Sequence, residues 1–317
     1  MKNKGINQGI AAGIASAILL GFTPIFGKLS IYFGFSPLFV VTFRSGLAST
    51  FLFIMLLLFR RQYFVIYPIG LFGCFVAGFI NGIGSIFYYS GLSFIDASVG
   101  QLLYSFYPLL VAFWLFLDRQ PFTKVSLLRL ILSLPGAFLL LTNARNEVNW
   151  MGALFMLIAA ALYSLHLIIN QRILFEAPAP TVAFYSLVSM TITVLLVYLI
   201  LDHQLPQKPL GWWPLIFLGL ITFLSRLTLF LGIKHVGGLQ TAMLGLGELL
   251  TTVVVANLWL GERLTPLQLT GGVMLGLSML LVGFDQPTPE KRRSTGWLAW
   301  LNPPSVSPTD LPWRSQN

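Results

Sequence analysis

Four charged side chains lie inside stretches of sequence that are otherwise apolar: Lys28, Arg44, Arg226 and Glu248. A charged residue at the centre of a helix that crosses a membrane costs about 2.5–3.5 kcal/mol on insertion scales, so it is a candidate for function. Guanidinium and ammonium groups bind carboxylates, whereas a carboxylate can take up a proton or bind an ammonium group. Three cations against one acid predict a site for an anionic or zwitterionic small molecule.

Lys28 and Arg44 lie near one end of neighbouring apolar runs, and each has more than one interpretation. Lys28 is shallow enough to reach the lipid headgroups, or it faces a cavity. The cavity is favoured by Pro24, which frees a backbone carbonyl near Leu20. Arg44 lies roughly 11 Å deep, where reaching the headgroups is strained. With no acid on either helix, both cations require an anionic partner, either a substrate carboxylate or a helix C-terminus.

Arg226 and Glu248 occupy consecutive apolar runs joined by the short turn "GIKHVGG". The short turn predicts antiparallel neighbouring helices, on which the two residues differ in depth by roughly 6 Å. One interpretation is a structural ion pair, in which the loss of either partner would leave a buried charge. The other is that Glu248 takes a proton or the ammonium group of a substrate.

Polar and aromatic residues are frequent on the runs that would flank a pathway. They are Asn81, Tyr88, Tyr89, Gln101, Tyr104, Ser105, Tyr107, Tyr163, His166 and Gln240. The helical spacing of Tyr163 and His166 places both on one face, although a lone buried histidine is more often a packing residue. The predicted substrate-binding residues are Lys28, Arg44, Asn81, Tyr88, Gln101, Tyr104, Tyr163, His166, Arg226 and Glu248.

The composition predicts a membrane protein. Of 317 residues, 56% are hydrophobic and only 9% are charged, and the mean hydropathy is +0.82. Soluble domains carry about 25% charged residues. The formal charge of +9 comes from basic residues in short loops and tails, so it indicates membrane topology and not nucleic-acid binding. A single cysteine, Cys74, excludes a disulfide framework or a cysteine-based metal site within the chain. No cofactor is predicted.

Ten apolar segments approach the roughly 20 residues that a membrane-spanning helix needs. They are 9–33, 37–59, 66–92, 97–117, 124–142, 150–174, 180–201, 211–233, 237–260 and 265–284. The first run follows Lys2 and Lys4 and is longer than the apolar core of a signal peptide, about 7–15 residues. It is therefore expected to be a retained membrane span.

The distribution of lysine and arginine predicts the orientation, because cytoplasmic loops are enriched in both. With the N-terminus inside, the outer loops hold only Arg145, Lys208 and Arg263. The inner loops and tails hold Lys2, Lys4, Arg60, Arg61, Arg119, Lys124, Arg129, Arg172, Lys234, Lys291, Arg292, Arg293 and Arg314. The expectation is a multi-pass protein of the plasma (inner) membrane with both termini cytoplasmic.

The two halves of the chain resemble each other. "GLSFIDASVGQLL" (91–103) parallels "GIKHVGGLQTAML" (232–244), and "GKLSIYFGFSPLFV" (27–40) parallels "NQRILFEAPAPTVA" (170–183). Each repeat then contains five spans, and because five is odd the second half must be inserted upside down. The predicted fold is an all-α integral membrane protein of ten transmembrane helices, arranged as two inverted five-helix repeats around a central cavity.

The predicted organisation has five parts. They are a cytoplasmic N-terminus at 1–8, a first repeat at 9–142, an outer linker at 143–149, a second repeat at 150–284, and a cytoplasmic disordered tail at 285–317. The tail is polar and contains prolines. Its stretch "TGWLAWLNPP" has two interpretations: contact with the membrane surface through Trp297 and Trp300, or a flexible segment without fixed contacts.

Several motifs, in order along the chain, are similar to those of one family. They are "GFTPIFGKLS" in the first span, "FRSGLAS" in the second, "LLYSFYPLLVAF" in the fourth, and "GLGELLTTVVVANLWLGERLTPLQLTGGVMLGLSMLLVG" in the last two. With them the chain resembles the EamA-type members of the drug/metabolite transporter superfamily over about 1–285. The chain departs from the pattern at "LFLDRQP", where Arg119 replaces a glutamate, and at Leu249, where the family commonly has proline.

The predicted function is secondary transport of a small metabolite, an amino acid or organic acid, by alternating access and in the export direction. Exporters of such metabolites are common in the family that the chain resembles. The sequence has no "GxxxxGK[ST]" phosphate-binding loop. The alternatives are an intramembrane enzyme, against which the lack of "HExxH" and "GxSxG" counts, or a membrane protein without transport activity. Proton coupling and oligomeric state stay open.

Overall fold

The computed structural model describes residues 2–95, 97–118, 123–140, 149–202, 211–260, 266–284 and 297–301. Within these residues the chain is helical and has no strand, as predicted. The predicted linker, apart from Asn149, and the predicted tail, apart from 297–301, lie outside the described residues. The same holds for the loop charges Arg119, Arg145, Lys208 and Arg263.

Helices occupy all ten predicted segments. Within the described residues, six helical runs are long and apolar enough to cross a membrane. The first is Gly5–Tyr32, within α1 (Lys2–Gly21) and α2 (Thr23–Tyr32); the others are α3 (Pro37–Phe59), α4 (Pro68–Phe94), α8 (Trp150–Leu174), α9 (Ala179–Leu201) and α10 (Trp213–Val236). The shorter helices are α5 (Ala97–Tyr104), α6 (Tyr107–Leu117), α7 (Lys124–Leu140), α11 (Gly238–Gly245), α12 (Gly247–Leu260) and α13 (Pro266–Leu280). Three 3-10 turns complete the set: η1 (Arg61–Phe64), η2 (Leu281–Phe284) and η3 (Ala299–Leu301).

Local chemistry explains where several of these helices begin and end. The side chain of Ser36 accepts a hydrogen bond from the backbone N of Phe39 (3.1 Å) and so caps α3. Pro37 fits the first turn of that helix, where its missing N–H is no loss. Gly237 separates α10 from α11 and has φ of 95°, a left-handed conformation that glycine adopts without steric cost.

Three of the predicted spans are interrupted. The first breaks at Phe22, just before Pro24; the fourth breaks at 105–106, just before Pro108; the ninth breaks at Leu246. A proline cannot donate to the preceding turn, so the helix is readily broken on its N-terminal side. The third break has glycines on both sides instead. Each break leaves the ends of two half-helices inside the bundle.

The helices of the two halves recur at a nearly constant spacing. Helix α3 at 37–59 and α9 at 179–201 differ by 142 residues at both ends, and α5 at 97–104 and α11 at 238–245 differ by 141. The same spacing relates α7 to α13 and α4 to α10 at one end of each helix. The broken spans α5–α6 and α11–α12 therefore occupy corresponding places in this spacing.

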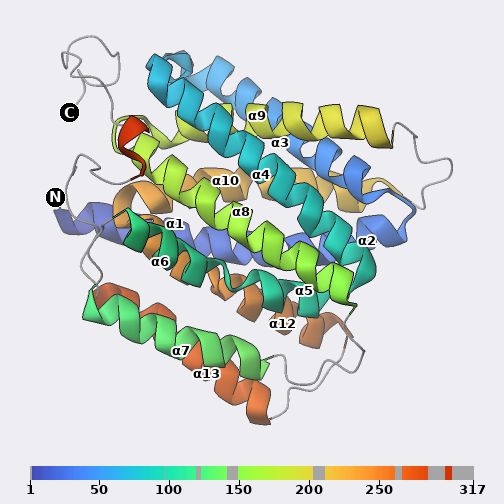
Figure 1. Ribbon diagram of the computed structural model, residues 1–317, viewed down its shortest axis with the longest axis vertical. Coiled ribbons are helices and arrows are strands. Elements are labelled where there is room, and N and C mark those ends of the chain that lie inside the picture. The colour runs from blue at the N-terminus through green and yellow to red at the C-terminus, as the bar shows by residue number, and fades with distance from the viewer. Residues whose placement is uncertain are drawn as a thin grey trace.

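The packing of the helices follows the same correspondence (Figure 1). Helix α4 packs against α8 and α9, and its counterpart α10 packs against α1 and α3. Helices α3 and α9 pack against each other, and so do α7 and α13, which lie together along one side of the bundle. The start of α1 and the short η3 lie at the same end of the bundle. This end is called here the N-terminal end.

Large apolar side chains cover much of the outer surface. Leu58 and Phe116 are each 68% exposed, and Ile200 is 74% exposed. In water such surfaces would aggregate, whereas in a bilayer they face acyl chains. Polar side chains are instead concentrated inside the bundle, where they form the sites described below.

Candidate functional site

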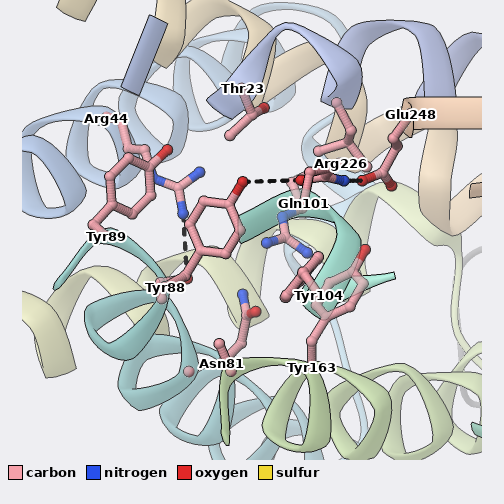
Figure 2. Close-up of a pocket in the computed structure, with 14 residues that line it drawn as sticks. Thr23, Arg44, Asn81, Tyr88, Tyr89, Gln101, Tyr104, Tyr163, Arg226 and Glu248 are labelled. Atoms are coloured by element: carbon pink, nitrogen blue, oxygen red, sulfur yellow. Dashed lines mark hydrogen bonds between the residues drawn. The ribbon is translucent and has the colours of Figure 1, made fainter. Parts of the chain in front are cut away.

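A polar cavity lies between the two halves of the bundle (Figure 2). It is lined by residues from α1, α2, α3, α4, α5, α8, α10 and α12: Leu20, Thr23, Arg44, Asn81, Gly84, Ser85, Tyr88, Tyr89, Gln101, Tyr104, Ala159, Tyr163, Arg226 and Glu248. Eight of the ten predicted substrate-binding residues are in this set. These eight residues are spread over most of the sequence, and the fold brings them together.

The interrupted helices meet this cavity at their breaks. Leu20 and Thr23 flank the break between α1 and α2, Tyr104 ends α5, and Glu248 lies in the first turn of α12. Half-helix ends carry backbone groups without partners in the helix, and the N-terminus of a helix favours a negative charge. The first turn of α12 is therefore a favourable position for the Glu248 carboxylate, and a broken helix at such a cavity is typical of secondary transporters.

Arg44 reaches into the cavity from α3 and is held by neutral groups. Its two terminal nitrogens donate to Thr222 Oγ1 (3.3 Å) and Ser85 Oγ (3.2 Å). The guanidinium lies over the ring of Tyr89, 4.7 Å from the ring centre, a favourable cation–π contact. Its Nε is buried and has no hydrogen-bond partner among the residues that the structure describes.

Arg226 enters the same cavity from α10 and is likewise held without a carboxylate. Its Nη1 lies 3.3 Å from His166 Nε2, and its guanidinium lies 5.8 Å from the ring centre of Tyr163. Nε of Arg226 is also buried without a partner in the described residues. In Figure 2 the ring of Tyr88 lies between the guanidinium groups of Arg44 and Arg226.

Glu248 is held by an amide and not by a cation. Gln101 Nε2 donates to its Oε2 (3.0 Å), and Tyr88 donates its hydroxyl to Gln101 Oε1 (3.1 Å). These two hydrogen bonds fix the orientation of the Gln101 amide. The carboxylate of Glu248 requires a donor and so faces Nε2, whereas the hydroxyl of Tyr88 donates to Oε1. The two bonds also join α4, α5 and α12 across the cavity.

The structural ion pair that one interpretation placed between Arg226 and Glu248 does not form. An ion pair is present between Arg172 and Asp118, at the N-terminal end of the bundle. Arg44, Arg226 and Glu248 are each about 95% buried, and their hydrogen-bond partners are the neutral groups given above. The two guanidinium groups therefore keep the capacity to bind an anion that enters the cavity.

Tyrosine rings form another part of the wall, and Tyr107 packs against them without lining the cavity itself. Tyr104 contacts Tyr88 and Tyr163, with ring centres 4.9 and 5.4 Å apart, and Tyr107 contacts Tyr163 at 5.1 Å. The hydroxyl of Tyr107 donates to the backbone O of Ala242 in α11 (3.1 Å). These amphipathic rings combine an apolar body with a polar tip, so the wall suits a small polar molecule.

Lys28 does not line the cavity. Its ammonium group donates to the backbone oxygens of Leu92 (2.6 Å) and Ile95 (3.0 Å), at the C-terminal end of α4. The sequence left two anionic partners open for Lys28, a substrate carboxylate and a helix C-terminus. In the structure Lys28 contacts a helix C-terminus, where the helix dipole stabilises a cation. A role of Lys28 in substrate binding stays a prediction.

His166 also lies outside the cavity, behind Arg226. It is 1% exposed and is placed on α8 against the backbone of α4, with Nδ1 2.9 Å from Ala77 O. The predicted shared face with Tyr163 is present, since the two rings stack with centres 6.0 Å apart.

Thr23, Ser85 and Thr222 were missed by the sequence analysis. Thr23 and Ser85 line the cavity, and Thr222 holds Arg44. Single hydroxyl residues in apolar helices commonly bond to their own backbone, so residue type alone does not distinguish them. A usable signal for Thr23 was its position beside Pro24 at the helix break.

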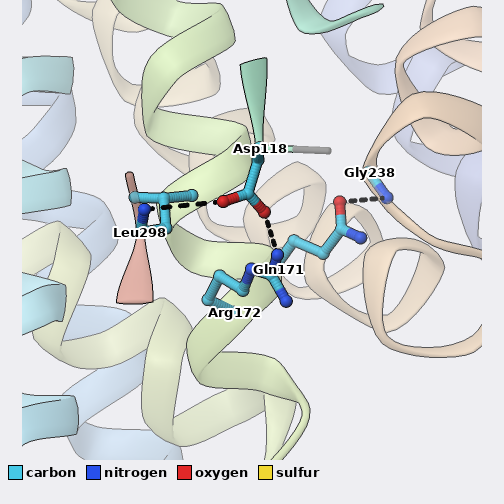
Figure 3. A network of polar contacts seen from close by, with 5 residues as sticks. All are labelled: Asp118, Gln171, Arg172, Gly238 and Leu298. Carbon is cyan, nitrogen blue, oxygen red and sulfur yellow. Dashed lines mark hydrogen bonds and ion pairs between the residues drawn. The ribbon is translucent and has the colours of Figure 1, made fainter. Parts of the chain in front are cut away.

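A second polar cluster lies at the N-terminal end of the bundle (Figure 3). Arg172, in the last turn of α8, pairs with Asp118, which ends α6. The other carboxylate oxygen of Asp118 accepts from the backbone N of Leu298 (3.5 Å). Next to Arg172, the side chain of Gln171 accepts from the backbone N of Gly238, which starts α11 (3.0 Å).

The described part of the predicted tail, 297–301, packs onto the bundle at this cluster. Leu298 and Leu301 are fully or almost fully buried. Trp297 contacts Trp114, with ring centres 5.6 Å apart, and Trp300 contacts Phe72 at 5.9 Å. These contacts are with helices of the bundle, an arrangement that neither interpretation of the tail had included.

The fold and the cavity together define a class: a multi-pass membrane protein that encloses a polar cavity among broken helices. Comparison with family models identifies the family. The EamA-like transporter family matches residues 7–142 and 150–284, so the chain belongs to this family. The resemblance drawn from the sequence motifs is thereby confirmed, and a transporter family points away from an enzyme.

Two relatives are themselves described as uncharacterised transporters. YcbK of Bacillus subtilis is 26% identical over 192 residues, which cover 57% of this chain and 62% of YcbK. The protein sll1319 of Synechocystis is 24% identical over 239 residues, covering 70% of this chain and 69% of sll1319. The match therefore spans less than two thirds of YcbK. Both are named as transporters, like the family to which this chain belongs.

Solved structures with a similar fold include one crystal structure of a protein. It superimposes with a TM-score of 0.69 at 16% sequence identity, and the match covers 87% of this chain and 97% of that chain. At this identity the likeness shows the fold alone.

Proposed function

We propose that the protein is a secondary transporter that exports a small anionic or zwitterionic metabolite, an amino acid or an organic acid. The observation that carries the proposal is the pair of buried arginines, Arg44 and Arg226, that face one cavity without a carboxylate partner. A buried guanidinium held only by neutral groups is unfavourable unless an anion joins it. A substrate carboxylate that approaches the Nε donors of the two arginines would supply that charge.

The substrate contacts in this proposal come from both halves of the chain. Residues that line the cavity would contact the substrate directly: Arg44, Asn81, Tyr88, Gln101, Tyr104, Tyr163, Arg226 and Glu248. Glu248 would bind a substrate ammonium group or a coupling proton, because its present partner is the neutral amide of Gln101. Lys28 and His166 would act from outside the cavity, by holding α4 and Arg226.

The proposed architecture is ten membrane spans in two inverted five-helix repeats. The 142-residue spacing of the helices supports it, together with the matching helix contacts in the two halves. The family match ends at 142 and resumes at 150, which agrees with the proposed boundary between repeats. In such folds the substrate site lies between the repeats, and one repeat rocks against the other to expose the site to each side in turn.

The proposed orientation places both termini in the cytoplasm and the protein in the plasma membrane. It rests on the excess of lysine and arginine in the loops on the side of the N-terminus, as described above. The N-terminal end of the bundle, with the Asp118–Arg172 cluster, would then face the cytoplasm.

The test is uptake of labelled amino acids and organic acids into proteoliposomes, with and without an imposed pH gradient. We expect saturable uptake of at least one compound, and a loss of about 10- to 100-fold in Arg44→Ala, the range for a hydrogen bond to a charged group. The matched control is Arg61→Ala, which removes an exposed arginine whose Nε donates to the backbone O of Leu57. Equal transport by the Arg44→Ala and Arg61→Ala proteins would contradict the proposal.

A further inference from the structure

Arg226 makes its side-chain hydrogen bond within the described residues to a single group, the imidazole of His166. A guanidinium is always a donor and has no acceptor. His166 Nε2 must therefore carry a lone pair in this contact and not a hydrogen. The contact with Arg226 therefore determines that Nε2 of His166 is unprotonated.

The other ring nitrogen is assigned by the backbone of α4. His166 Nδ1 lies 2.9 Å from the carbonyl oxygen of Ala77, and a carbonyl can only accept. Nδ1 must therefore carry the hydrogen. Nδ2 of Asn170 lies 3.0 Å from Nδ1 and 3.4 Å from Nε2 of the ring. One of its two hydrogens goes to the backbone O of His166 (2.8 Å), and with a hydrogen already on Nδ1 the second can go only to the lone pair of Nε2. Oδ1 of Asn170 accepts from Ser186 (2.8 Å). The two constraints agree on one form of the ring: neutral, with the hydrogen on Nδ1.

The surroundings of the ring hold it in this orientation. Tyr163 stacks on one side and Phe230 lies near it, each with ring centres 6.0 Å away. The titratable and charged groups that face the imidazole are Arg226 from α10 and Tyr163 from its own helix, while Cys74 lies one turn before Ala77 on α4. A proton added to Nε2 would point at the guanidinium of Arg226 and remove its acceptor.

The geometry points to His166 as the positioning residue for Arg226: a neutral Nδ1–H imidazole that fixes Nη1 and leaves the other donors of the guanidinium directed at the cavity. This assignment rests on the proposed function, since it defines how one of the two anion-binding arginines is oriented. It gives His166 a role without substrate contact.

Three substitutions separate this role from simple packing. Glutamine at position 166 places an acceptor near the position of Nε2, asparagine places polar atoms near the position of Nδ1, and leucine provides neither. For a labelled panel compound such as L-serine or succinate that shows saturable uptake, we expect His166→Gln to stay within about threefold of the wild-type KM. We expect His166→Asn and His166→Leu to raise KM about tenfold or more, with a smaller change in the maximal rate. Equal effects of all three variants would overturn the assignment.

A second measurement does not depend on transport. The full chain carrying ¹⁵N-labelled histidine is purified in detergent, and the signal of His166 is identified by its absence in His166→Gln. We expect a neutral ring with Nδ1 protonated and Nε2 unprotonated at pH 7, and a changed Nε2 signal in Arg226→Leu. A hydrogen on Nε2, or no response to Arg226→Leu, would overturn the assignment. His235→Gln, at the distant end of α10, is the control.

The two measurements also distinguish the two proposals. If no panel compound is transported while the ring has the expected form, the proposed function fails and the contact between His166 and Arg226 stands. If transport occurs but the ring carries its hydrogen on Nε2, the proposed function stands and the positioning role fails.

Discussion

Two of the buried polar clusters in the described part of the chain have their charges arranged in opposite ways. At the N-terminal end of the bundle, Asp118 is paired with Arg172 and also accepts from the backbone of the tail. In the central cavity, Arg44 and Arg226 are held by hydroxyl, imidazole and aromatic groups, and Glu248 by an amide. The first cluster neutralises its charges internally, whereas the second leaves them able to receive an external partner.

This difference separates buried charges that stabilise the structure from buried charges that are available for function. A buried pair satisfied on both sides locks the helices that carry it, and the loss of one partner is expensive. A buried charge held by neutral dipoles is tolerated and can change its partner as a substrate or proton arrives. The comparison can be tested by substitutions that remove charges from each cluster.

The largest effect is expected from Asp118→Ala, which would leave the Arg172 guanidinium buried without its carboxylate. We expect the free energy of unfolding to fall by about 3–5 kcal/mol. The measurement is the temperature at which half of the detergent-purified protein stays monodisperse on size-exclusion chromatography.

The double variant Asp118→Leu with Arg172→Met removes both charges and should recover most of that loss, because no charge is left alone. If Asp118→Ala is as stable as the wild type, or if the double variant is no more stable than the single one, the Asp118–Arg172 pair does not stabilise the bundle as proposed.

A smaller effect, on transport and not on stability, is expected from Glu248→Gln. The substituted side chain can still accept from Gln101, so the fold should be unchanged, but it can no longer release a proton. For a compound whose uptake is stimulated by a pH gradient, we expect the stimulation to be lost, a fall of about tenfold or 1.4 kcal/mol. Asp202→Asn, at the C-terminal end of α9 and outside both clusters, is the matched carboxylate-to-amide control. Stimulation that survives in Glu248→Gln would remove Glu248 as the proton site.

The smallest effect is expected from Lys28→Met, which removes the cation at the C-terminal end of α4. A cation at a helix C-terminus contributes up to about 1 kcal/mol, so the unfolding temperature should fall slightly while KM stays within about twofold. Lys234→Met, which removes a bond to the backbone O of Ala177, is the control for general loss of a lysine. A large rise in KM for Lys28→Met alone would place Lys28 in the substrate site after all.

The buried charges of the cavity could be predicted because a charge in an apolar run is visible in sequence. Arg44, Arg226 and Glu248 were found in this way, and helical spacing added Tyr104 and Tyr163. Their partners could not be predicted. The similar depth of Arg226 and Glu248 on neighbouring helices suggested that they could pair. The direction of a side chain around its helix is set by packing, which the sequence does not reveal. In the structure Arg226 contacts His166, and Glu248 accepts from Gln101.

The helix positions could be predicted almost completely, since apolar length and turn residues determine them. The docking of 297–301 could not. Trp297 and Leu298 stand in a short polar, proline-containing context, and the surface that receives them is assembled from separate helices that include α4 and α6. A five-residue segment carries no periodic signal that would reveal such a surface.

The seam between α4 and α9 has a consequence for how the molecule can move. A Cβ atom added at Gly78 would lie 2.6 Å from that of Ser189, and one added at Gly82 would lie 3.0 Å from that of Thr193, so the two backbones are in close contact. Small residues one turn apart allow such close packing in membranes. Helices packed this closely cannot slide past each other without a clash of Ser189 and Thr193 against the backbone of α4. Under the proposed mechanism, α4 and α9 would therefore move together as one unit.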